Sequence, residues 1–134
     1  MEDVLVVDDD NTILEVIKRI LAYDGIVAHC VSSGAEALEK MKERNFPLMI
    51  TDFNMPGLNG LELARRGLEI APQMRIIMDT GGISATNVRL ALEIGISKIV
   101  SKPFLPDEML KTVRGLMGTK ELPCTWELRG EICS

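Results

Sequence analysis

Short apolar runs alternate with segments of helical periodicity five times along this chain, and this alternation restricts the fold more than any other feature. The first run, Val4 to Val7, is continuous and rich in β-branched residues, which is typical of a strand buried on both faces. Helical spacing follows from Ile13 to Leu21. The predicted strands are 4–7, 26–30, 48–51, 75–78 and 99–100. Five βα units in succession predict an α/β fold with a doubly wound parallel sheet between two layers of helices.

Capping residues predict where the helices begin and end. Thr12 and Glu15 have the spacing of a capping box, and Ser33 with Glu36 repeats it before the second helix. Gly25 is expected to end the first helix. The other helices are predicted over 61–70, 84–93 and 106–118. Residues 1–118 are therefore expected to form one domain, and residues 119–134, which lack a clear period, a tail or linker.

The composition limits the partners and the compartment. Fifteen Lys and Arg against twenty Asp and Glu give a formal net charge of −5, so without a basic stripe we expect no direct nucleic-acid contact. No apolar run approaches the roughly 20 residues of a membrane span, so no membrane insertion is expected. The cysteines (Cys30, Cys124 and Cys133) show no CxxC spacing, which favours reduced thiols in a cytoplasm. Cys30 is predicted to be a small buried strand residue.

Reactive side chains stand at the ends of four predicted strands. Asp8 and Asp9 follow the first strand, Asp52 the third, Thr80 the fourth and Lys102 the fifth. Because open α/β sheets bind ligands beyond the carboxyl ends of their strands, we expect these side chains on one rim. Crowded carboxylates need a cation, and a few hard oxygen ligands suit Mg²⁺. One carboxylate could attack phosphorus while Lys102 and Thr80 bind the phosphoryl oxygens.

Four segments at these strand ends together resemble the receiver domain of two-component response regulators. They are residues 6–10, 51–60, 80–81 and 101–104, and the resemblance extends over roughly residues 1–117. It implies a flavodoxin-like sheet of strand order 2-1-3-4-5 flanked by five helices. It also implies a phosphohistidine donor on a sensor histidine kinase or histidine phosphotransfer protein, and an output partner or domain. Dimerisation is common in the family, although nothing in the sequence establishes a homodimer.

The resemblance also assigns roles position by position. Asp52 matches the phosphoacceptor, and Thr80 and Lys102 match the phosphate-binding pair. The peptide bond after Lys102 is typically cis in such domains. A receiver is a signalling domain and not an enzyme toward an outside substrate, although it accelerates its own phosphorylation and dephosphorylation. The implied Mg²⁺ ligands are Asp8 (through water), Asp9, Asp52 and the backbone carbonyl of Asn54.

Three positions depart from the family pattern. Ile99 stands where many receivers carry an aromatic residue that moves with Thr80. Gly82 offers no side chain to shield a phosphoryl group, which predicts easy water access and a short-lived phosphoaspartate. Asp79 ends a predicted buried strand, where it either faces away from the rim and needs a partner, or adds another acid to the site.

Other classes of protein explain less of the sequence. The segment from Asp8 to Ile13 also resembles the first motif of haloacid-dehalogenase-like phosphatases, with Asp8 as nucleophile and Asp10 as general acid and base. Such enzymes require a further acidic pair after the lysine strand, which residues 103–106 do not supply. A calcium loop is disfavoured because Ile13 replaces the required glycine. An adaptor on a receiver scaffold would be expected to have lost a site residue, and none is missing.

Overall fold

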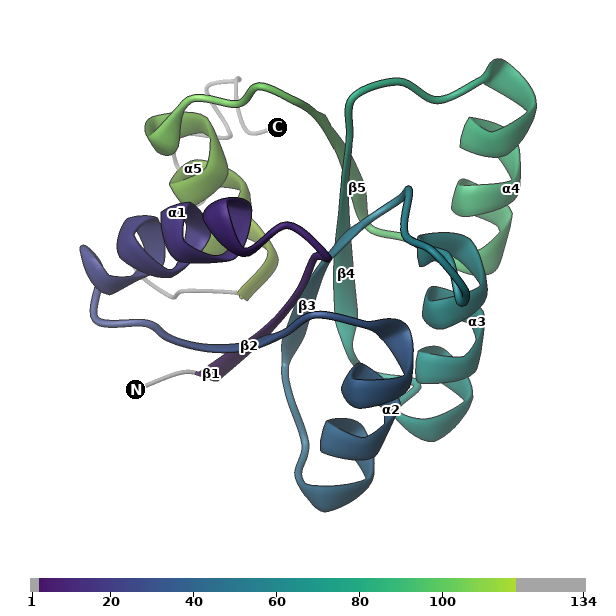
Figure 1. Ribbon diagram of the computed structural model, residues 1–134, viewed down its shortest axis with the longest axis horizontal. Coiled ribbons are helices and arrows are strands. Elements are labelled where there is room, and N and C mark those ends of the chain that lie inside the picture. The colour runs from purple at the N-terminus through teal and green to yellow at the C-terminus, as the bar shows by residue number, and fades with distance from the viewer. Residues whose placement is uncertain (1–2, 118–134) are drawn as a thin grey trace.

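The computed structural model describes residues 3–117 as a parallel sheet between two layers of helices (Figure 1). The strands are β1 (Asp3–Val7), β2 (Val27–Val31), β3 (Leu48–Asp52), β4 (Arg75–Thr80) and β5 (Lys98–Ser101). The helices are α1 (Asn11–Ala22), α2 (Gly34–Glu43), α3 (Gly60–Ile70), α4 (Ala85–Ile94) and α5 (Pro106–Met117). The sheet order is β2-β1-β3-β4-β5, which confirms the predicted fold class. The predicted tail, with Cys124 and Cys133, lies outside the described residues.

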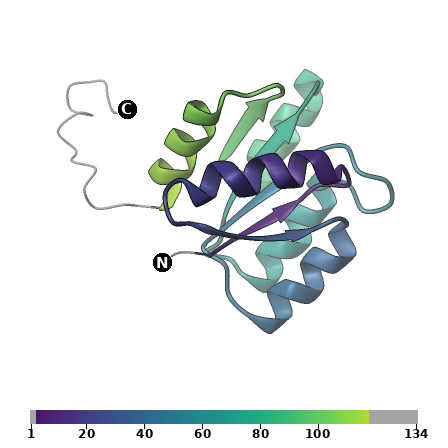
Figure 2. The same ribbon diagram turned by 60° about the vertical axis from the view of Figure 1, so that its left-hand side comes forward.

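Alternate side chains of each strand point to opposite faces of the sheet and form two separate cores. On one face, strand residues such as Val6 and Ile50 pack with Ile17 of α1 and Val113 of α5. On the other face, residues such as Met49 pack with helices α2, α3 and α4. Figures 1 and 2 show this division, with α1 and α5 together on one side. All five residues of β3 are buried, so β3 forms the centre of the molecule.

Side chains cap the N-termini of helices α1 to α4. Ser33 accepts a hydrogen bond from the Glu36 backbone N–H, and Ser84 caps α4 in the same way. The capping box predicted at Thr12 is wrong, because Asp10 is the N-cap of α1 and accepts a hydrogen bond from the Thr12 N–H. The N-cap of α1 therefore lies two residues earlier than the Thr–Glu spacing indicated.

Two strands differ from the prediction in ways that matter for the side chains. β2 is an edge strand, and Cys30 on it is exposed instead of buried. β4 runs two residues beyond the apolar run 75–78, to Thr80 at the predicted strand end, so Asp79 is part of the sheet. None of the helices within 3–117 is both long and apolar enough to cross a membrane.

Candidate functional site

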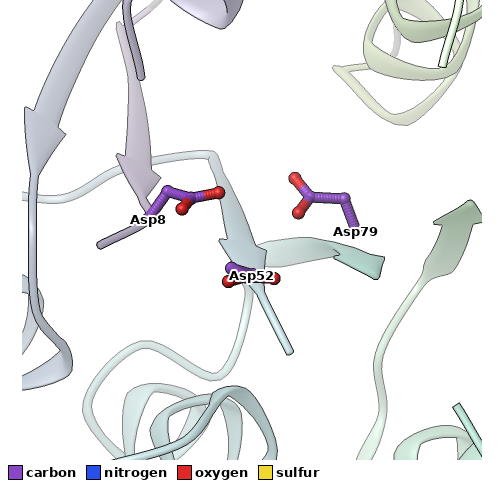
Figure 3. Close-up of side chains that lie close together, drawn as sticks. All are labelled: Asp8, Asp52 and Asp79. Atoms are coloured by element: carbon purple, nitrogen blue, oxygen red, sulfur yellow. The ribbon is translucent and has the colours of Figure 1, made fainter. Parts of the chain in front are cut away.

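Three aspartates meet where β1, β3 and β4 end. Asp52 is the last residue of β3, Asp79 is its register partner on β4, and Asp8 directly follows β1. Each carboxylate contributes an oxygen to a group in which all three oxygens lie within 4.8 Å of one another (Figure 3). Their exposed fractions are 1% for Asp8, 5% for Asp52 and 1% for Asp79. We call these three residues the acid cluster.

Lys102 supplies the positive charge of the cluster. It follows β5, and its Nζ atom lies 3.2 Å from Asp52 Oδ1, 3.3 Å from Asp8 Oδ2 and 3.4 Å from Asp79 Oδ1. The contacts to Asp52 and Asp8 are hydrogen bonds in which the ammonium donates. The Asp79 contact is an ion pair without hydrogen-bond geometry, and both Asp79 carboxylate oxygens are buried without a hydrogen bond. The Lys102–Pro103 peptide bond is cis, as predicted.

The site shifts the proton affinities of its members. Burial raises the pKa of Asp79 to about 7, with the Asp8 and Asp52 charges adding to the rise and the Lys102 charge opposing it. Burial likewise raises the pKa of Asp8, although the Asp10 N–H and Lys102 act against it. Burial disfavours the ammonium of Lys102, but the charges of Asp79, Asp8 and Asp52 outweigh this and raise its pKa above the ordinary value. The ammonium is therefore a permanent charge.

The remaining predicted residues are not members of this cluster. Asp9 is exposed and contributes no oxygen to the group of three. Asn54 is exposed two residues after β3. Thr80 is 2% exposed at the end of β4, and its hydroxyl donates to the Gly82 carbonyl at 2.8 Å and accepts from the Gly82 N–H at 3.0 Å. The Thr80 hydroxyl is thus engaged by its own loop.

The donor set fits a hard divalent cation. Three buried carboxylates and one ammonium together carry a formal charge of −2 when all are ionised. The Asp79 oxygens, buried without hydrogen bonds, retain acceptor capacity. Oxygen ligands of this kind suit Mg²⁺ better than a soft metal.

Asp79 is the member of the cluster whose orientation the sequence left open. Parallel pairing places residues in register on the same face of the sheet, and Asp79 pairs with Asp52. Extending strand four by two residues would have predicted that register and the inward orientation. Figure 3 shows the Asp79 carboxylate directed toward Asp8, with Asp52 between the two strands that carry them.

Gly60 supports the site through a close backbone approach. A Cβ atom at this position would lie 2.4 Å from the Asp52 carbonyl oxygen and 2.9 Å from the Phe53 Cα. We expect Gly60→Ala to push α3 from the end of β3 and to lower the free energy of unfolding by about 1–3 kcal/mol in urea titrations. Gly82→Ala is the control, since its Cβ would meet nothing within 4 Å. Equal stability of the two variants would contradict this role of Gly60.

Comparison with known proteins gives a consistent result. Residues 4–114 match the family model "Response regulator receiver domain". The chain is 32% identical over 118 residues to the DNA-binding response regulator MtrA of Mycolicibacterium smegmatis, covering 88% of this chain and 51% of MtrA. It is also 32% identical to the uncharacterized transcriptional regulatory protein YkoG of Bacillus subtilis, covering 87% of this chain and 53% of YkoG. The chain thus spans about half the length of these curated relatives.

Solved structures agree in fold. A CheY-like receiver domain protein from Methanospirillum hungatei superimposes with a TM-score of 0.85 at 30% identity, covering 87% of this chain and 94% of that one. The beryllofluoride-activated NtrC4 receiver domain dimer gives a TM-score of 0.83 at 30% identity, covering 87% and 97%. These matches favour the receiver over the phosphatase that Asp8 and Asp10 suggested.

Proposed function

Because this chain belongs to the response regulator receiver family, we propose that Asp52 accepts a phosphoryl group in a Mg²⁺-dependent reaction and thereby switches a partner-binding surface. The observation that carries this proposal is the Asp52 carboxylate, held at a strand end beside a permanently charged ammonium at 3.2 Å. A nucleophile and a fixed counter-charge at one rim are what phosphoryl transfer requires, since positioning and charge neutralisation supply most of the catalysis.

In the proposed reaction, an Asp52 carboxylate oxygen attacks phosphorus on a phosphohistidine donor. A P–O bond forms, the P–N bond breaks, and its electron pair leaves with the imidazole nitrogen. Lys102 stabilises charge on the transferring group, and Thr80 supplies a hydroxyl once it is released from Gly82. A bound Mg²⁺ would neutralise charge on phosphoryl oxygens. We assign its ligands to Asp9, Asp52 and the Asn54 carbonyl, with Asp8 acting through water.

The proposed partners follow from the same chemistry. The donor is a sensor histidine kinase or a histidine phosphotransfer protein, and the output is a partner or domain that reads the switched surface. We place this exchange in the cytoplasm. MtrA is described as DNA-binding, but for the present segment, with its net charge of −5, we propose no direct nucleic-acid contact. A homodimer is proposed as one route for the output.

Acetyl phosphate labelling tests the assignment directly. The protein is incubated with acetyl phosphate and Mg²⁺, the phosphoryl adduct is detected by intact-mass spectrometry, and its position is mapped on peptides. We expect a Mg²⁺-dependent label on Asp52 that a chelator prevents. A label on Asp8 accompanied by turnover of phosphomonoesters would instead support a phosphatase.

Gly82 leads to a prediction about the lifetime of the phosphoryl group. It is exposed, its backbone N–H and carbonyl form hydrogen bonds with the Thr80 hydroxyl, and a Cβ atom there would meet nothing within 4 Å. We expect Gly82→Leu to keep the fold and to slow hydrolysis of phospho-Asp52 by roughly 3–10-fold, because an apolar side chain hinders access of the attacking water. The decay of the labelled protein measures this rate. A wild-type lifetime of many hours would contradict the underlying hypothesis.

A further inference from the structure

Asp79 is a buried ionisable group that the proposed reaction does not use. It is 1% exposed, in register with the phosphoacceptor on the neighbouring strand, and its carboxylate oxygens receive no hydrogen bond within 3–117. The Lys102 ammonium, at 3.4 Å, is the cation that faces it. Burying a carboxylate with so little compensation is costly. We therefore infer that the negative charge of Asp79 contributes to the charge balance of the site.

The negative charge of Asp79 favours binding of a cation to the unphosphorylated site but disfavours a phosphoryl group on Asp52. With all three acids ionised, the acid cluster and Lys102 carry a formal charge of −2, which one divalent cation brings to zero. Phosphorylation then replaces one negative charge on Asp52 by roughly two on the phosphoryl group. The cluster, Lys102 and the cation are then left with one excess negative charge. Asp9, which we assign to the same cation, adds one further negative charge in both states, so removing Asp79 makes the cation-bound site and the phosphorylated site each less negative by one charge. At low effective dielectric constant such differences matter.

We propose that Asp79 is a positioning residue that holds the Lys102 ammonium and sets the charge of the site. Compared with a site that lacks this carboxylate, the unphosphorylated domain then binds divalent cations more tightly, and the phosphorylated domain binds the phosphoryl group less tightly. The proposal rests on the proposed function, since it concerns the same cation and the same acceptor. Asp79 competes with phosphoryl oxygens for Lys102, because its carboxylate is one of three that already share this ammonium.

Two substitutions that remove the charge test this role. Asp79→Asn keeps the size of the side chain, and Asp79→Val is apolar and favourable in a buried strand. Glu93→Gln is the matched control, because it removes one negative charge from an exposed position near the end of α4, at the opposite end of the sheet. Circular dichroism establishes that each variant is folded, and the Val variant carries the test if the Asn variant is not.

Two titrations at pH 8.5 give the readout. Isothermal titration calorimetry with MgCl₂ measures the affinity for the cation. Titration with beryllofluoride at saturating Mg²⁺ measures the affinity for an analogue of the phosphoryl group. We expect both Asp79 variants to bind Mg²⁺ about tenfold more weakly and beryllofluoride about tenfold more tightly, about 1.4 kcal/mol in each case. The Glu93→Gln variant should change neither constant by more than about twofold.

The opposite changes in the affinities for Mg²⁺ and for beryllofluoride distinguish this role from a structural one. A packing defect would weaken both ligands, so parallel losses, or unchanged constants in both variants, would overturn the role of Asp79. Failure of the proposed function looks different, because the wild-type protein itself would then bind no beryllofluoride and take no label on Asp52. That outcome would overturn the phosphoryl half of this proposal as well.

Discussion

Replacing Asp52 with asparagine is expected to abolish stable phosphoryl labelling of this protein by acetyl phosphate. The carboxylate oxygen is the atom that would bond to phosphorus, and a neutral amide is a far poorer nucleophile. Asparagine has nearly the same volume, and Lys102 keeps Asp8 and Asp79 as counter-charges at 3.3 Å and 3.4 Å. The variant should therefore fold normally and lose labelling by roughly 100-fold or more.

Two further variants make the experiment decisive. Glu93→Gln, which changes an exposed carboxylate far from the carboxyl ends of the strands, should be labelled like the wild-type protein. Asp8→Asn should retain the labelled position, although at a reduced rate, because Asp8 shares Lys102 with the acceptor. Labelling that persists in Asp52→Asn and disappears in Asp8→Asn would transfer the nucleophile to Asp8 and end the proposed function.

The second large effect concerns stability. We expect Asp79→Val to raise the free energy of unfolding by about 1–3 kcal/mol at pH 8 in the absence of divalent cations. The substitution removes a carboxylate whose buried oxygens lack hydrogen bonds, and Lys102 retains two other acids. Urea unfolding with a chelator present measures the change. A variant less stable than the wild-type protein would show that the Asp79–Lys102 ion pair outweighs the cost of burial.

The pH dependence gives an independent check on the same residue. The pKa of Asp79 is about 7 in the folded protein, against an ordinary value of 3.8. Between these values the folded protein binds more protons at Asp79 than the unfolded chain does, so stability should rise as the pH falls from about 7 toward 4. We expect this slope to be smaller in Asp79→Val, with the raised pKa of Asp8 supplying what remains.

The sequence predicted the fold well because its signals are local and repeated. Each strand is a short apolar run followed by a helix with its own cap, and such units leave few arrangements other than a doubly wound sheet. Ser33 marks a helix boundary where the structure places it, and the helix predicted from residue 84 begins directly after Ser84. The errors are of the kind that local signals allow. Both Asp10 and Thr12 are suitable N-cap residues for the first helix, and the structure has Asp10 in that position.

The site was predictable in part for a related reason. Strand-end position placed Asp8, Asp52 and Lys102 on one rim, and the structure brings their charged atoms together. The orientation of Asp79 depends on where a strand ends and with what register it pairs, which a single sequence specifies weakly. The exposure of Cys30 follows from β2 lying at an edge of the sheet, which the expected strand order 2-1-3-4-5 implied but the local residue pattern around Cys30 did not indicate.

The charged atoms of the site have unequal mechanical support. Asp8, Asp52 and Asp79 are attached to the three interior strands, whereas Lys102 follows β5, an edge strand of four residues that pairs with β4 alone within 3–117. If a phosphoryl group draws the ammonium toward itself, we therefore expect β5 and the first turn of α5 to be displaced before the interior strands that carry the acids.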